Sequence, residues 1–76
     1  GVLIYHNPNY DILNIGCLLT NETKSIIIYA LLGNIVKQLS INNKQVTINV
    51  VDLNEGVYFI SLENKNGKIV KKIIKN

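Results

Sequence analysis

Few side chains in this 76-residue chain are of the types that do chemistry. There is one histidine, His6, and one cysteine, Cys17. The fold would have to assemble a Cys–His nucleophile pair, but Cys17 lies in an apolar stretch, where a free cysteine usually packs as a small hydrophobe. The five acids all fall in or beside expected turns and strand ends: Asp11, Glu22, Asp52, Glu55 and Glu63. None is paired at a spacing suited to acid–base catalysis.

Other kinds of reactive site are equally poorly represented. A single cysteine excludes an internal disulfide and a cysteine-based zinc site. One histidine with dispersed carboxylates is not a metal-binding pattern, and the sequence has no glycine-rich loop suited to phosphate. We therefore expect that the protein is not an enzyme and that it needs no metal and no cofactor.

Positive charge is concentrated at the C-terminal end. The net charge of +3 comes from eight lysines without any arginine. Five of the eight come after residue 64: Lys65, Lys68, Lys71, Lys72 and Lys75. They fit either a docking surface for an anionic partner or an exposed edge strand protected against pairing with other sheets. The lack of arginine, which is favoured for base and phosphate recognition, argues against a nucleic acid as partner.

The composition predicts one folded domain over residues 1–76. Ile, Val and Leu supply 29 residues and only 17% of residues are charged, which excludes a disordered tail. No apolar run approaches the length of about 18 residues that a membrane span needs. The sequence has no methionine, so we expect it to be a piece of a longer or processed protein.

Turn-forming residues recur about every ten residues, and β-branched runs lie between them. This spacing predicts an all-β fold, a two-sheet antiparallel sandwich of about seven short strands. The expected strands cover residues 1–5, 11–19, 24–32, 35–41, 44–50, 56–63 and 68–75. Their short edges allow weak edge-to-edge dimerisation.

The turns differ in type. Gly33-Asn34 and Asn42-Asn43 suit tight two-residue hairpins, and Asn66-Gly67 is the strongest hairpin signal in the sequence. Residues 53–56 read as a longer turn. The strand at 24–32 is apolar on both faces, which predicts a central strand covered on both sides.

The last segment carries two patterns. Ile69, Val70, Ile73 and Ile74 have the spacing of an amphipathic basic helix. The β-branched content and the preceding Asn-Gly turn favour a strand, in which a bulge between the two apolar pairs would restore the phase. We expect the strand.

The aromatic residues fit a core better than a stacking platform for sugars or bases. They are Tyr5, Tyr10, Tyr29, Tyr58 and Phe59. The order Gly56-Val57-Tyr58 predicts that the Tyr58 hydroxyl bonds the backbone of the preceding turn.

Four stretches, taken together and in order, carry a resemblance that covers the whole chain. They are IYHNPNYDILNI, IIIYALLGNIVKQL, INVVDLNEGVYFISL and the terminal NGKIVKKIIKN. The chain resembles the type A C-terminal sorting domain of type IX secretion cargo proteins from Bacteroidetes-type bacteria. His6 departs from the family pattern where a proline is usual, and Ala30 where an acid or amide is frequent.

The resemblance implies a seven-stranded immunoglobulin-like sandwich at the C-terminus of a secreted precursor. Such domains direct a folded, covalently attached N-terminal cargo from the periplasm across the outer membrane to the cell surface or medium. The implied partners are an outer-membrane translocon or shuttle and a sortase-like peptidase, which cuts upstream of the domain as cargo is anchored or released. We expect that cut upstream of Gly1.

The resemblance also supplies candidate recognition residues. They match the opening, Gly-x-Tyr and terminal motifs: Asn7, Pro8, Gly56, Tyr58, Lys71, Lys72, Ile73 and Lys75. Our hypothesis is that the final strand presents its backbone edge and ammonium groups to a translocon component, which pairs with it by strand addition. The alternatives are an immunoglobulin-like accessory module that binds polysaccharide or another protein and, less favoured, a nucleic-acid-binding β module.

Overall fold

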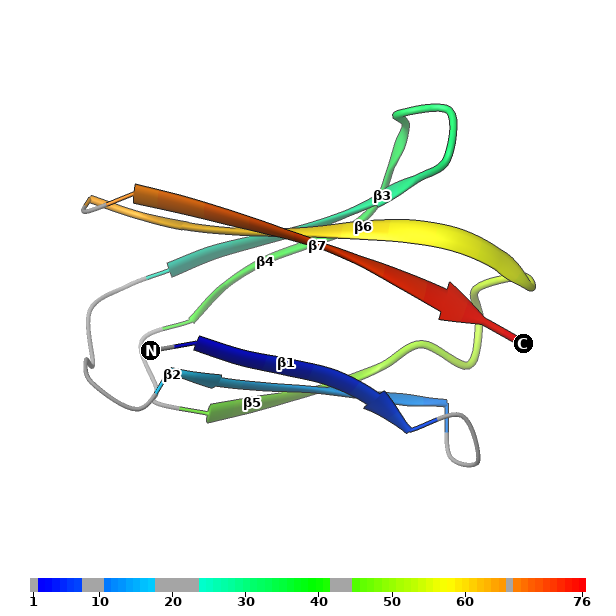
Figure 1. Ribbon diagram of the computed structural model, residues 1–76, viewed down its shortest axis with the longest axis horizontal. Coiled ribbons are helices and arrows are strands. Elements are labelled where there is room, and N and C mark those ends of the chain that lie inside the picture. The colour runs from blue at the N-terminus through cyan, green and yellow to red at the C-terminus, as the bar shows by residue number, and fades with distance from the viewer. Residues whose placement is uncertain (1, 8–10, 18–23, 42–44, 66) are drawn as a thin grey trace.

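A computed structural model describes residues 2–7, 11–17, 24–41, 45–65 and 67–76 of the chain, and these ranges hold seven strands and no helix. The strands form two stacked antiparallel sheets, which confirms the predicted sandwich (Figure 1). Each predicted range overlaps one observed strand, and the observed ends lie within two residues of the expected ones.

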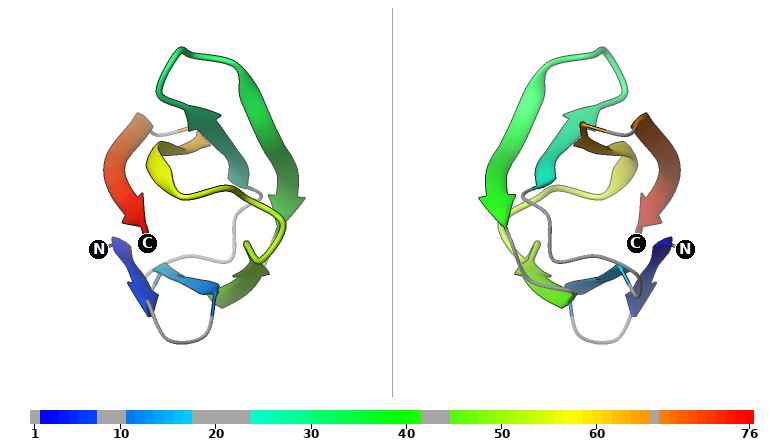
Figure 2. Two further views of the ribbon diagram at one scale, coloured as in Figure 1. Left: turned by 90° about the vertical axis from the view of Figure 1, so that its right-hand side faces the viewer. Right: turned by 90° about the vertical axis from the view of Figure 1, so that its left-hand side faces the viewer.

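The smaller sheet has three strands in the order β1-β2-β5. They are β1 (Val2–Asn7), β2 (Ile12–Cys17) and β5 (Gln45–Asn49). The larger sheet has four strands in the order β4-β3-β6-β7. They are β3 (Lys24–Ala30), β4 (Ile35–Ile41), β6 (Gly56–Asn64) and β7 (Gly67–Lys75). The end-on views of Figure 2 show β1 and β7 side by side at one edge of the sandwich.

The core lies between the two sheets and follows from the alternation of side chains along each strand. The buried apolar residues come from both inner faces: Ile4, Leu13, Ile15, Ile26, Ile28, Ile48, Val50, Tyr58, Ile60, Leu62 and Ile73. Strand β3 is central in its sheet, but only its inner side chains, Ile26 and Ile28, are fully buried. Ile27, on its outer face, is only half-buried, so the prediction of cover on both sides is wrong.

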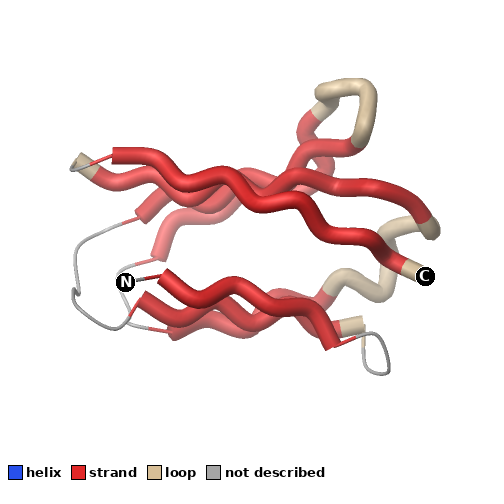
Figure 3. Tube along the Cα trace, viewed as in Figure 1, coloured by secondary structure: helices blue, strands red, loops and turns tan. Residues whose placement is uncertain are grey.

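The β3–β4 connection is longer than expected. It is a four-residue loop closed by two backbone bonds, in which the Gly33 N–H donates to the Ala30 carbonyl and the Ala30 N–H to the Asn34 carbonyl, each at 2.9 Å. Gly33 adopts a φ of +96°, which the loop needs and other residues rarely take. The predicted two-residue turn is therefore wrong, and Leu31 and Leu32 leave the sheet in a loop that projects beyond it (Figure 3).

The Asn42-Asn43 hairpin is also wrong, because β4 and β5 belong to different sheets and do not pair. Both asparagines lie outside the described residues. Turn residues allow a reversal, but burial of the apolar face decides whether the next strand pairs or crosses to the other sheet. The predicted hairpin near Asn66-Gly67 is confirmed by the pairing of β6 with β7. Its position differs by one residue, because Gly67 is the first residue of β7 and pairs with Asn64, and Asn66 itself is not described.

The C-terminal segment is the expected strand. Its pairing with β6 runs without a shift from Gly67 to Lys75, so the predicted bulge is wrong. The helix-like spacing arises because both faces of β7 carry apolar residues. Ile69 and Ile73 lie on the inner face, opposite Leu62 and Tyr58, and the alternate residues lie on the outer face.

Tyr58 makes the predicted lock between β6 and the turn before it. The side chain is buried, and its hydroxyl donates a 2.7 Å hydrogen bond to the Asn54 carbonyl oxygen. The bond fixes the start of β6 against the β5–β6 connection.

Replacing Tyr58 by Phe should lower the free energy of unfolding by about 1 kcal/mol, because the Asn54 carbonyl loses its partner. Urea denaturation of the 76-residue chain measures the change. The matched control is Tyr29→Phe in β3, which removes a half-buried hydroxyl that forms no such lock. Equal effects of the two substitutions would contradict the role given to the Tyr58 hydroxyl.

Candidate recognition surface

The structure brings parts of all four family-like stretches to one end of the sandwich. Gly56, at the start of β6, is the register partner of Lys75 at the end of β7, and Tyr58 is the partner of Ile73. Ala30, at the end of β3, pairs with Tyr58 from the other side. Figure 1 shows the ends of β1 and β7 and the start of β6 at this same end. Asn7 is the last residue of β1, whereas its side chain and Pro8 lie outside the described residues.

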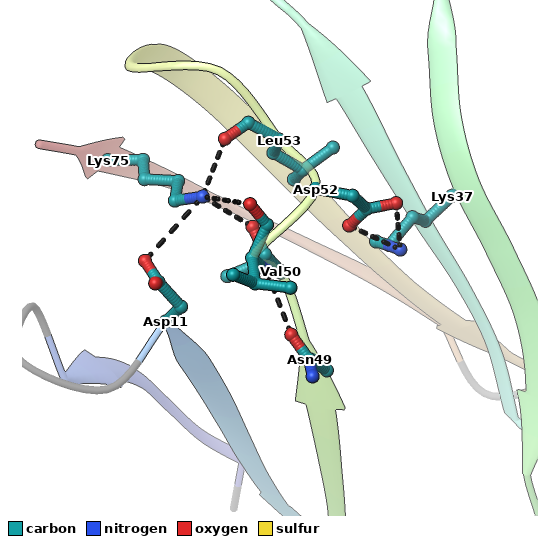
Figure 4. Close-up of polar contacts among 8 residues, drawn as sticks. Asp11, Lys37, Asn49, Val50, Asp52, Leu53 and Lys75 are labelled. Atoms are coloured by element: carbon teal, nitrogen blue, oxygen red, sulfur yellow. Dashed lines mark hydrogen bonds and ion pairs between the residues drawn. The ribbon is translucent and has the colours of Figure 1, made fainter.

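Lys75, a residue only 6% exposed, joins three of these stretches through its ammonium group. Its Nζ donates to the carbonyl oxygens of Val50 at 2.6 Å, Val51 at 3.2 Å and Leu53 at 2.5 Å. The Asp11 carboxylate, just before β2, lies 3.6 Å from the same nitrogen (Figure 4). One side chain of the terminal strand therefore ties together β2, β7 and the connection after β5.

The surroundings of Lys75 account for its burial. An ammonium group has three N–H donors, and here it faces three carbonyl oxygens and one carboxylate. The Val50 N–H also donates to the Asp11 carbonyl at 2.8 Å, which holds the two sides of the site together. We call this group of residues the Lys75 junction: Asp11, Val50, Val51, Leu53 and Lys75.

Lys71 makes a second bridge between the sheets. Its Nζ donates a 2.6 Å hydrogen bond to the carbonyl oxygen of Ile4 in β1. Lys71 and Lys75 both lie on the inner face of β7, where they span the edge at which β1 and β7 are neighbours. Lys68 and Lys72 lie on the outer face and are exposed, and among the described residues neither is engaged in an ion pair.

The predicted recognition residues therefore fall into two groups by position. Tyr58, Ile73 and Lys75 are buried within the sandwich, whereas Lys72 is accessible from outside. Sequence reasoning missed the structural role of Lys75. The sequence did contain a signal for this role, because residues two apart in a strand point to the same face. Lys75 follows Ile73 by two residues and therefore shares its inner face.

A second ion pair lies at the opposite edge of the larger sheet. The Lys37 Nζ of β4 is 3.0 Å from the Asp52 Oδ1 in the β5–β6 connection. The hydrogen bond from Lys37 lowers the pKa of the exposed Asp52 carboxyl below its ordinary value. Pairs of this kind contribute little to stability because water screens them.

A shallow pocket of about 300 Å³ lies between the β3–β4 loop and the start of β6. Its lining is mixed: Ala30, Leu31, Leu32, Asn34, Glu55, Gly56, Val57 and Tyr58. Glu55 is its only carboxylate, and the Tyr58 hydroxyl is already bonded to Asn54. The pocket has no acid–base pair with which to catalyse a reaction.

Within the described residues, no three His, Cys, Asp or Glu side chains come together as metal ligands. The described part of the chain also has no helix long and apolar enough to span a membrane. The side chains of His6 and Cys17 lie outside the description.

Comparison with known families gives one match. A family model described as the secretion system C-terminal sorting domain matches residues 3–76 and so takes in both sheets. No curated protein matches the chain.

Replacing Lys75 by Met should lower the free energy of unfolding by about 2–3 kcal/mol, because three carbonyl oxygens lose a charged donor. Lys72→Met on the exposed face of the same strand should change it by less than about 0.5 kcal/mol. Urea denaturation of both variants, with the wild-type chain beside them, measures the difference. The structural role of the Lys75 junction would be refuted if Lys75→Met were as harmless as Lys72→Met.

Proposed function

The chain belongs to the family of secretion system C-terminal sorting domains, the sorting signals of type IX secretion, and from this we propose how it acts. Membership implies export to the cell surface or extracellular space and interaction with the type IX machinery. In our proposal the domain directs a folded N-terminal cargo from the periplasm across the outer membrane. A sortase-like peptidase then cuts upstream of the domain as the cargo is anchored or released.

The family match over residues 3–76 is the observation that carries this proposal. The geometry is compatible with it, because the described residues form a packed two-sheet sandwich and contain no cluster of metal ligands. The Lys75 junction and the Lys71 bridge hold the terminal strand against both sheets. The domain therefore reaches the machinery with that strand already ordered, which lowers the entropic cost of recognition.

We place the contact with the translocon or shuttle on β7. This strand is the outer strand of its sheet, and an outer strand offers backbone groups for strand addition. Lys72 contributes a charge that points to solvent, whereas Gly56, Tyr58, Ile73 and Lys75 act by shaping the end of the sandwich. Lys71 does both, since it is exposed yet bonded to Ile4. Asn7, the last residue of β1, and Pro8 complete the opening motif.

A transplant tests the function. Residues 1–76 are fused to the C-terminus of a fluorescent protein that carries an inner-membrane export signal. The fusion is expressed in a type IX-competent bacterium and in a secretion-null sibling, and periplasm, surface and medium are separated. We expect reporter at the surface or in the medium only in the competent strain. Folded, uncleaved reporter in the periplasm of both strains would overturn the proposal and favour the polysaccharide-binding module, which sugar titration of the domain would detect.

Replacing both Lys71 and Lys72 by Ala should keep the fold and reduce export of the fusion about three- to tenfold, because recognition loses two charges. The single change Lys72→Ala tests recognition more directly, because Lys71→Ala also removes the hydrogen bond to the Ile4 carbonyl. The control is Lys37→Ala, on the opposite outer strand β4. Unchanged export of Lys72→Ala, with circular dichroism showing a folded domain, would remove this residue from the recognition surface.

A further inference from the structure

The outer face of the four-stranded sheet carries more apolar side chains than a sheet face exposed to solvent normally does. Strand register places its side chains in rows that run across the strands. One row pairs Ile74 with Val57 and is extended by the loop residue Leu31, which lines a pocket together with Val57. The next joins Lys72, Phe59, Tyr29 and Ile35, and the third joins Val70, Ser61, Ile27 and Gln38. We call these three rows the outer patch.

Most of the outer patch is apolar and open. Ile74 is 54% exposed, Val70 55%, Ile35 53% and Leu31 64%. The patch is continuous between its two sides, because Val57, Phe59, Tyr29 and Ile27 are half-buried in the middle. Ser61 is almost fully buried although it lies on this face, which means that its larger neighbours close over it.

An antiparallel sheet with one face on the core normally presents polar side chains on the other face. The first two rows of the outer patch break that rule, because they are apolar except for Lys72. The third row combines the apolar Val70 and Ile27 with two polar residues, and the fourth row, outside the patch, is wholly polar: Lys68, Glu63, Ser25 and Ser40. Contiguous apolar surface rimmed by polar residues marks interaction sites in soluble proteins.

We propose that the outer patch is the docking face for a protein of the export machinery that carries an apolar surface bordered by acidic residues. The inference rests on the proposed function and deepens it, because it adds a partner chemistry and a second face to the contact along β7. The charges on this face of the sheet favour such a partner. Lys72 lies within the patch and Lys68 in the row beside it, whereas Glu63 is the only acid among the described residues of this face.

The same charges disfavour two other occupants. A second copy would bring the lysines of two patches into one interface, where like charges repel. An anionic membrane would be attracted by two lysines only weakly, and the domain has no tryptophan to anchor it at the interface.

The chain offers a matched pair of valines for the test. Val70 lies in the outer patch, and Val51 lies away from it in the β5–β6 connection with a similar exposure of 62%. Val51 contributes only its backbone carbonyl to the Lys75 junction, and a side-chain substitution leaves that carbonyl in place. Replacing valine by threonine keeps the β-branched shape and substitutes a hydroxyl for one exposed methyl group. The test variant is the double change Val70→Thr with Ile74→Thr, and the control is Val51→Thr. Circular dichroism and urea denaturation establish that all three chains are folded.

The variants are compared as reporter fusions in the type IX-competent strain and its secretion-null sibling. We expect the test variant to lower type IX-dependent export at least about tenfold, because Val70 and Ile74 are exposed apolar anchors of the patch and a few such anchors carry most of the affinity of an interface. Val51→Thr should leave export unchanged, and Lys68→Glu with Lys72→Glu should lower it as well. If the wild-type fusion fails to be exported, the proposed function itself fails. If the wild type and the test variant are exported equally, only the outer patch is refuted.

Two measurements on the purified 76-residue chain distinguish the other occupants. Sedimentation over a range of concentrations detects a dimer, and flotation with phosphatidylglycerol vesicles detects membrane binding. A wild-type dimer or vesicle complex that the test variant loses would overturn the proposal in favour of a second copy or a membrane surface. A wild-type chain that stays monomeric and does not bind vesicles, together with the export defect of the test variant, would support a protein partner.

Discussion

The buried ammonium group of Lys75 is the interaction on which the rest of this sandwich depends. Taking a charge out of water costs several kcal/mol, and here three carbonyl oxygens and the Asp11 carboxylate offset that cost. These acceptors come from the start of β2 and from the connection between β5 and β6. The terminal strand is thereby attached to the smaller sheet as well as to its own, and the two sheets are held together.

Much of this architecture could be predicted from sequence, because alternation and turn chemistry are local. The seven strands, the hairpin before Gly67 and the Tyr58 bond are of this kind. The crossover after β4 could not be predicted, because residues that permit a turn do not determine which sheet receives the next strand. The loop at Gly33 is longer than expected because β3 ends at Ala30, and the backbone bonds between Ala30 and Asn34 close the loop there. The Lys75 junction forms only where three segments that are far apart in the sequence meet. The sequence indicated it only through the position of Lys75, two residues after Ile73 and so on the same face of the strand.

In our proposal, the two faces of β7 let one short strand serve both folding and recognition. Its inner side chains, including Ile73 and Lys75, complete the core and the junction. Its outer side chains, Lys72 and Ile74 among them, are accessible. Under this proposal the lysine-rich terminal motif has two tasks, and sequence alone does not separate them. A strand fixed from within presents its outer face without a further loss of conformational entropy, as a recognition handle for export requires.

The most direct test of this account is the behaviour of the Lys75 ammonium group itself in the isotopically labelled domain. Proton–nitrogen spectroscopy of lysine side chains reports both solvent exchange and scalar coupling across hydrogen bonds. The account predicts a slowly exchanging Lys75 signal coupled to the carbonyl carbons of Val50 and Leu53, while the Lys72 signal exchanges rapidly. A Lys75 ammonium group that exchanges as fast as that of Lys72 and shows no coupling would contradict it.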